Sequence, residues 1–227
     1  MSKLKFLLNS IIYKLKSNTY FRAIARNTVY KYPHIIKWGK YDLDFTNKKK
    51  NNDYSKKILI APVVNSDQTL ACLHSLLGVA LTLKNCKVDY LICDMILPAC
   101  TNVINHVIKE EDFINYGPKK VCSSCYDCNH TLFSPIDKNY LRLSHYLDNN
   151  DYEYAKKLSK KLSKTEIISF KKDNVNIGEH CLAGTLRFYG IGNINIKKNS
   201  LMVLRKYFES ALLTKISIEK ILKKINI

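Results

Sequence analysis

The chain has 227 residues, and 46% of them are hydrophobic, which is enough for a packed core and excludes a disordered tail or a fibre. Its seven glycines and five prolines are few for a turn-dense all-β sandwich, and its eight cysteines are too few for a disulfide scaffold. The net charge of +18 points to an anionic partner: nucleic acid, a membrane surface or a phosphorylated substrate.

The positive charge is concentrated toward the two ends of the chain. Residues 1–57 carry a balance of +11, residues 58–155 carry −4 and residues 156–227 carry +11. Much of the excess is lysine beside asparagine and isoleucine, a bias that AT-rich coding alone can produce, so a functional basic surface is one of two interpretations. A nucleic-acid interface usually relies on arginine for bidentate contacts, and the chain has only five arginines. Nucleic acid is therefore the less favoured partner.

The first 56 residues are predicted to form a basic N-terminal helical segment and a linker. In residues 1–16 the apolar positions repeat at helical spacing with lysines between them, which indicates an amphipathic helix and not the continuous apolar region of an export signal. Such a helix could pack on the protein's own core or on a neighbouring chain, or lie on an anionic membrane face. Because no transmembrane helix is predicted either, we expect a cytoplasmic protein, free or peripheral at the inner face of the membrane.

Residues 57–227 are predicted to form an α/β domain that opens with a βαβ unit. Strands over 58–64 and 88–93 flank a helix over 70–83, a pattern typical of a parallel strand pair. Such sheets bind ligands beyond the carboxyl ends of their strands, where the polar residues that follow the two predicted strands would lie: Asn65, Ser66, Asp67 and Asp94. No glycine-rich phosphate loop follows the first strand, so neither an NAD nor an ATP motif is present.

The rest of the chain is predicted to be mainly helical. Helices are expected over four ranges, the last with a break near 214–217: 136–147, 150–163, 178–189 and 201–225. The predicted fold class is therefore α/β, a small Rossmann-like parallel sheet with flanking helices, a helix-rich C-terminal part and a cysteine-rich loop.

The cysteine-rich loop, residues 122–130, is the densest chemical signal. Two thiolates in a C-x-x-C spacing can bind one soft cation, and a tetrahedral zinc needs two more ligands. The preferred ligand set is Cys100, Cys122, Cys125 and Cys128, with His130 and Cys181 as other candidates. Structural zinc is the favoured metal, an iron–sulfur cluster would accept the same thiolates but is less favoured, and reduced cysteines without any metal remain an equal alternative. A redox dithiol is the least favoured interpretation.

A second polar group lies in residues 178–187. Glu179, His180 and Arg187 could supply a general base, an oxyanion stabiliser or a phosphate clamp. The alternative is a helix N-terminus with a surface glutamate and a structural arginine.

Several short motifs resemble, in order over residues 57–225, the amino-terminal half of bacterial capsule or surface polysaccharide biosynthesis proteins of the GT-B glycosyltransferase type. They are Ile58–Val64, Leu91–Cys100, Cys122-Ser-Ser-Cys125, Gly178-Glu-His, Thr185-Leu-Arg and Arg205–Leu212. In that family the first half mainly shapes the acceptor side, and the second half holds most of the nucleotide-sugar donor.

The resemblance implies a glycosyltransferase-like protein, with a nucleotide sugar and a glycan acceptor as partners and Asn65, Ser66 and Asp94 on the acceptor side of the cleft. His180 and Arg187 would line the same cleft. The chain ends where the family enters its donor half, so we expect a partner chain to supply that half, or a truncated or non-catalytic form. The rival hypothesis is a basic, metal-knuckle module that binds nucleic acid.

Overall fold

The computed structural model describes residues 36–41, 54–62, 68–104 and 107–226. The chain divides into two compact units, Met1–Ile36 and Lys37–Ile227, and nearly all described residues belong to the second. The predicted amphipathic helix of residues 1–16 lies outside the described residues, as does most of the predicted linker.

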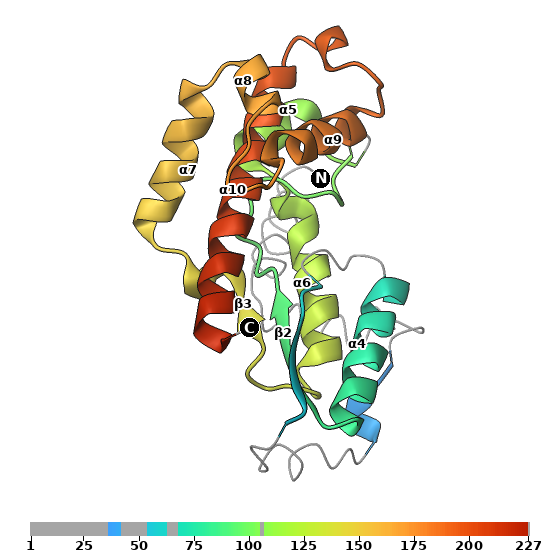
Figure 1. The fold of residues 1–227 in the computed structure, drawn as a ribbon. Coiled ribbons are helices and arrows are strands. Elements are labelled where there is room, and N and C mark those ends of the chain that lie inside the picture. Colours follow the sequence, from blue (N-terminus) through green and yellow to red (C-terminus); the bar gives the residue numbers. More distant parts are fainter. Residues whose placement is uncertain (1–35, 42–53, 63–67, 105–106, 227) are drawn as a thin grey trace, which may run out of the picture. The chain divides into compact units, whose positions relative to one another are not determined.

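The second unit is an α/β fold with a three-stranded parallel sheet and many helices (Figure 1). Its strands and helices follow one another in this order: η1 Trp38–Lys40, β1 Lys56–Ile60, α4 Gln68–Leu83, β2 Cys86–Ile92, α5 Glu110–Tyr116, α6 Lys119–Phe133, β3 Leu141–Arg142, η2 Leu143–Tyr146, α7 Asn149–Lys161, α8 Lys164–Ile168, α9 Ile177–Tyr189, η3 Ile194–Ile196 and α10 Ser200–Ile225.

The predicted βαβ unit is confirmed. Strands β1 and β2 are parallel, with Lys56 opposite Cys86 and Ile60 opposite Tyr90, and helix α4 connects them. The central strand β2 ends in Tyr90, Leu91 and Ile92, which are at most 1% exposed. A run of consecutive buried side chains is expected for a central parallel strand, because both of its faces are covered.

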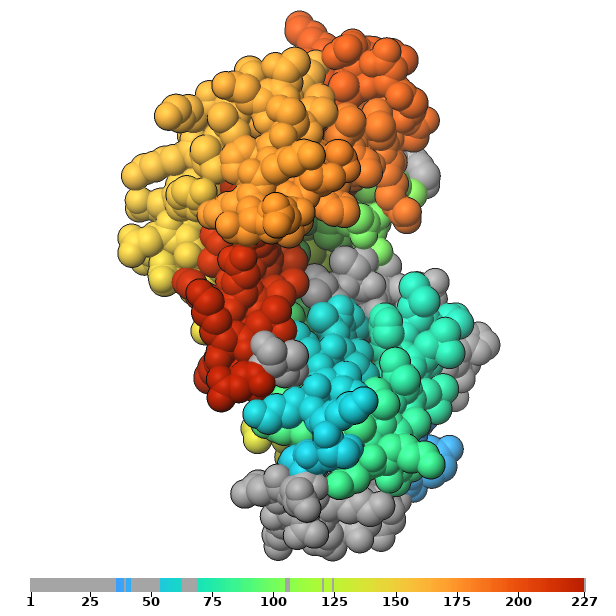
Figure 2. Space-filling view, in the orientation of Figure 1, coloured from blue at the N-terminus to red at the C-terminus, as the bar shows by residue number. Residues whose placement is uncertain are grey.

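Helices α4 and α6 pack against β2. A methyl group at Gly78 of α4 would overlap the phenol of Tyr90, so the glycine allows the helix to approach the strand. The ring of Phe133 in α6 lies 4.9 Å from that of Tyr90, centre to centre. Helix α4 reaches the surface (Figure 2), where five of its leucines are about half exposed: Leu70, Leu73, Leu76, Leu77 and Leu83. Exposed apolar faces of this kind commonly mark contacts with another surface.

Helix α10 is the central helix of the C-terminal part, and α7 and α9 pack on it (Figure 1). The Ser159 hydroxyl of α7 donates to the Glu209 carboxylate at 2.7 Å, and Arg205 donates to the Lys160 carbonyl at 3.0 Å. The predicted break near 214–217 is wrong. The helix continues because Leu212, Leu213 and Ile221 stay in the core, and the buried Ser217 hydroxyl donates to the Leu143 carbonyl.

Two further predictions are wrong. Residues 136–147 are not a helix but contain β3 and η2, because Asp137 accepts the Asn139 N–H in a local turn and β3 pairs with the carboxyl end of β2. The cysteine-rich segment is not a loop but helix α6. The sequence indicates this helix through the spacing of Val121, Cys125, Cys128 and Leu132, which matches the period of an amphipathic helix.

Candidate functional site

The segment that leaves the carboxyl end of β2 leads into the candidate site. Both oxygens of the Asp94 carboxylate accept hydrogen bonds from Ser144, one from its N–H at 3.1 Å and one from its hydroxyl. Asp94 therefore joins the end of β2 to η2, and its carboxylate is already engaged in the fold. The other two residues predicted on the acceptor side, Asn65 and Ser66, lie outside the described residues.

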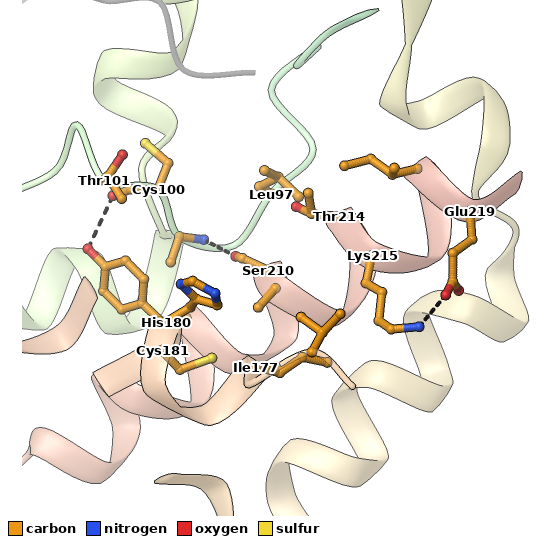
Figure 3. A pocket seen from close by; sticks show the side chains of 15 residues that line it. Leu97, Cys100, Thr101, Ile177, His180, Cys181, Ser210, Thr214, Lys215 and Glu219 are labelled. Atoms are coloured by element: carbon orange, nitrogen blue, oxygen red, sulfur yellow. Dashed lines mark hydrogen bonds and ion pairs between the residues drawn. The ribbon is translucent and has the colours of Figure 1, made fainter. Parts of the chain in front are cut away.

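Beyond Asp94, residues 97–101 form one wall of a pocket of about 520 Å³ (Figure 3). Helix α9 supplies Ile177, His180 and Cys181, and helix α10 supplies the face from Tyr207 to Glu219. The 97–101 segment is fixed on α10 by two hydrogen bonds: the Ala99 N–H donates to Ser210 Oγ at 2.6 Å, and the Tyr207 hydroxyl donates to the Cys100 carbonyl at 3.1 Å. The pocket is lined mostly by apolar side chains with a few polar groups among them, which is typical of small-ligand sites.

His180 is the predicted catalytic residue that the fold places in this pocket. It lies in the first turn of α9 and is exposed, and within the described part of the chain its imidazole has no hydrogen bond or ion pair. Both ring nitrogens are therefore available to a ligand.

Glu179 and Arg187 are not among the residues that line the pocket. Glu179 accepts a hydrogen bond from the Asn176 amide at 3.1 Å. Both residues are exposed, Glu179 in the first turn of α9 and Arg187 in the last. Arg187 lies two turns along the helix from His180, about 10 Å at the rise of an α-helix, and its charge acts on Tyr207. The three residues that the sequence grouped as one catalytic set thus occupy separate positions.

Lys215 is a pocket residue that the sequence analysis missed. Its ammonium donates to Asp173 at 2.6 Å and also to Glu219, one helical turn farther along α10, and its side chain is only 9% exposed. These two hydrogen bonds raise the pKa of Lys215 above its ordinary value. The i, i+4 spacing of Lys215 and Glu219 was visible in the sequence, but Asp173 comes from a distant turn.

The ion pair of Lys215 and Asp173 should stabilise the protein by an amount that depends on pH. Hydrogen bonding to Lys215 lowers the pKa of Asp173 below its ordinary value of 3.8. The contribution of this ion pair to the free energy of unfolding is therefore present above pH 3.8 and is lost as the pH falls through the lowered pKa. We expect Asp173→Asn to lower the melting temperature at pH 7 but not near pH 2. Asparagine tolerates the left-handed backbone of this position, where φ is 50°, so backbone strain is not added. An equal loss at both pH values would contradict the assignment.

The four predicted metal ligands lie in two segments. Cys100 is in the pocket wall, and Cys122, Cys125 and Cys128 are on α6. Cys128 is buried, and the thiols that act on it are those of Cys125 and Cys72. Across the described residues, no group of three or more His, Cys, Asp or Glu side chains is arranged to hold a metal ion as the structure stands.

Comparisons with known proteins found no match to a protein-family model, to a curated protein or to a solved structure. No helix in the described part of the chain is both long and apolar enough to cross a membrane.

Proposed function

We propose that this protein is a glycosyltransferase-like protein of surface polysaccharide biosynthesis, and that its pocket binds the acceptor. The observation that carries the proposal is the pocket itself: it opens beyond the carboxyl end of β2, where open α/β sheets bind ligands, and it contains an unpaired histidine. The motif resemblance supplies the reaction class, and the geometry supports a place for the acceptor.

The lining of the pocket favours an acceptor with an apolar part. Leu97, Ile177 and Ile218 provide aliphatic walls, and hydroxyls such as that of Thr214 provide hydrogen-bonding groups among them. An acceptor sugar on a lipid or alkyl carrier would place its carrier against the aliphatic wall and its sugar hydroxyls near the polar groups. A free hydrophilic sugar would leave the aliphatic wall unused.

In the proposed reaction, His180 takes the proton of an acceptor hydroxyl. The hydroxyl oxygen forms a bond to the anomeric carbon of the donor as the bond from that carbon to the nucleoside diphosphate breaks, and the nucleoside diphosphate leaves with the bonding electrons. The nucleotide sugar would be held by a second, donor-binding half like that of the family whose motifs the chain resembles. Contact of residues 1–16 with the inner face of the membrane would bring the protein to a lipid-linked acceptor.

Filling the pocket tests this proposal. Ala211 lies on its wall, and Ala211→Phe should occupy the space of the acceptor's carrier. We expect octyl glucoside, below its micelle concentration, to bind the wild type with a measurable heat in calorimetry, and the variant to bind at least tenfold more weakly. Octyl glucoside should also bind more tightly than glucose.

The matched control is Ala183→Phe, because Ala183 is exposed on α9 and is not among the pocket residues. Its affinity should equal that of the wild type. Equal affinity in Ala211→Phe, with an unchanged melting curve, would contradict the proposal. Tight, salt-dependent binding of single-stranded nucleic acid without any response to glycosides would favour the rival nucleic-acid module.

A further inference from the structure

Helix α4 is apolar on both of its sides. Its sequence contains no aspartate, glutamate, lysine or arginine, although these residues make up 25% of the chain. One side is buried against β2, where Gly78 lies against the phenol of Tyr90. A helix that is apolar all round is normally covered all round. The other side of α4 is therefore expected to meet a partner.

This other side, the outer face of α4, has the residue spacing of a helix–helix contact. It consists of six exposed residues: Leu70, Leu73, Leu76, Leu77, Ala80 and Leu83. Its five leucines are each 45–55% exposed, on a helix that lies at the surface (Figure 2). Positions 70, 73, 77 and 80 follow one another at intervals of three, four and three residues. These are the intervals at which the side chains of two packed helices interlock, so the outer face fits another helix.

The outer face is complementary to a second copy of itself when the two helices run antiparallel. With the two-fold axis between positions 76 and 77, Leu70 lies opposite Leu83 of the partner subunit, and Leu73 lies opposite Ala80 of the partner subunit. The second of these pairs joins a large side chain to a small one, which is how facing helices interdigitate. Such a contact uses the same face on both copies and closes as a symmetric dimer.

Charge favours the antiparallel arrangement over the parallel one. Lys84 directly follows the outer face and is exposed. In a parallel pair each residue meets its own copy, so the two Lys84 ammonium groups would be adjacent and would repel. In the antiparallel pair Lys84 lies opposite Thr69, so the two lysines are about 22 Å apart along the axis, well beyond the Debye length of about 8–10 Å. Antiparallel helix dipoles also attract one another.

The area of the outer face sets the expected strength of this contact. A helix of 16 residues is about 24 Å long and 10–12 Å wide, so two half-surfaces would bury about 800 Å² in total. Interfaces at this low end of the size range form dimers that dissociate readily. A helix that lies on a membrane surface carries lysines or arginines beside its apolar face, and α4 contains neither. The observations therefore favour a second copy of the chain over a membrane.

We propose that two copies of this chain form a symmetric dimer through antiparallel packing of the outer faces of α4. The uncharged faces meet in the middle, which allows two chains of net charge +18 to approach each other. No residue of α4 lines the pocket formed by residues 97–101, α9 and α10. The dimer therefore does not depend on the proposed function.

Sedimentation velocity of the full-length protein tests whether the dimer forms. We expect the wild type to change from monomer to dimer between about 1 and 200 µM. Leu77→Lys would place two lysines at the two-fold axis and should weaken dimerisation at least about 100-fold. The matched control is Met202→Lys, because Met202 is 52% exposed on α10, outside the outer face. Its dimerisation should stay within about twofold of the wild type.

Disulfide crosslinking tests the orientation, and it decides the question if Leu77→Lys fails to fold. Under mild oxidation Leu77→Cys should give a covalent dimer, because its two copies lie beside the two-fold axis. Leu70→Cys should give no more than the wild type, whose own cysteines set the background. In the antiparallel pair its two copies are about 20 Å apart along the axis.

A wild type that stays monomeric at about 200 µM, or a Leu77→Lys variant that dimerises like the wild type, would overturn the proposal. Equal crosslinking of Leu70→Cys and Leu77→Cys would overturn the antiparallel arrangement. A monomeric wild type that binds vesicles of phosphatidylcholine and phosphatidylglycerol, with binding lost in Leu77→Lys, would assign the outer face to a membrane instead.

Discussion

Gly178→Ala should destabilise the protein by about 3 kcal/mol or more, because overpacking of a rigid contact is costly. A Cβ atom at this position would lie 2.2 Å from each of the carbonyl oxygens of Ile167 and Ile168. Both obstacles are backbone atoms, Ile167 is fully buried, and the Gly178 N–H donates to the Phe170 carbonyl at 2.9 Å. The start of α9 would have to move away from α8, and His180 would move with it.

The matched control is Gly192→Ala. A Cβ atom at Gly192 meets nothing within 4 Å. This substitution should leave the free energy of unfolding within about 0.5 kcal/mol of the wild-type value, or raise it slightly because alanine lowers the conformational entropy of the unfolded chain. Urea unfolding followed by circular dichroism measures both. If the two variants differed by less than about 0.5 kcal/mol, the packing of α9 on α8 would not be as described.

Under the proposed function, His180→Gln should lower the turnover number for glycosyl transfer by about 10²–10⁴-fold, the usual contribution of a general base. Glutamine keeps the polarity of the side chain and some of its hydrogen bonding but cannot accept the acceptor's proton at neutral pH. Because we propose that the acceptor binds mainly through the aliphatic wall, the dissociation constant for the glycoside should change by no more than a few fold. The assay requires a donor-binding half and a nucleotide sugar in addition to the glycoside.

Glu179→Gln is the control for this prediction. Glu179 is next to His180 in the sequence but pairs with Asn176 and is not part of the pocket lining, so its turnover should stay within about twofold of the wild type. Equal losses in the two variants would restore the grouping that the sequence suggested. An unchanged turnover number in His180→Gln would show that His180 is not the general base.

The elements predicted correctly are those whose own residues form a clear apolar pattern. The run Ile58–Ile60 and the buried end of β2 were recognisable because a central parallel strand is apolar on both faces. Helix α7 was predicted from its apolar spacing, and Asp148 is its N-cap. Asp151 is the third residue of the capping box, whose hydrogen bonds only the structure shows.

The missed features depend on contacts between distant residues. The two residues of β3 pair with Leu91 and Ile92. The strand propensity of two residues is too weak to be recognised beside the apolar helical pattern of the surrounding sequence, so a helix was predicted there. The cysteine spacing on α6 satisfies a metal motif and a helical period at once, so sequence alone could not decide between them. His180 was recognisable as a polar group near glycines, but its pocket is formed by α10, some 30 residues away.

Photocrosslinking tests most directly whether the pocket holds the acceptor. An alkyl glycoside with a diazirine in its alkyl chain would be bound to the full-length protein and irradiated, and the modified residues located by mass spectrometry. We expect adducts on residues 97–101, on Ile177 and on the pocket face of α10 near Ile218, and we expect them to be lost with excess unlabelled glycoside and in Ala211→Phe. Adducts confined to the exposed leucines of α4, or unaffected by competitor, would contradict it.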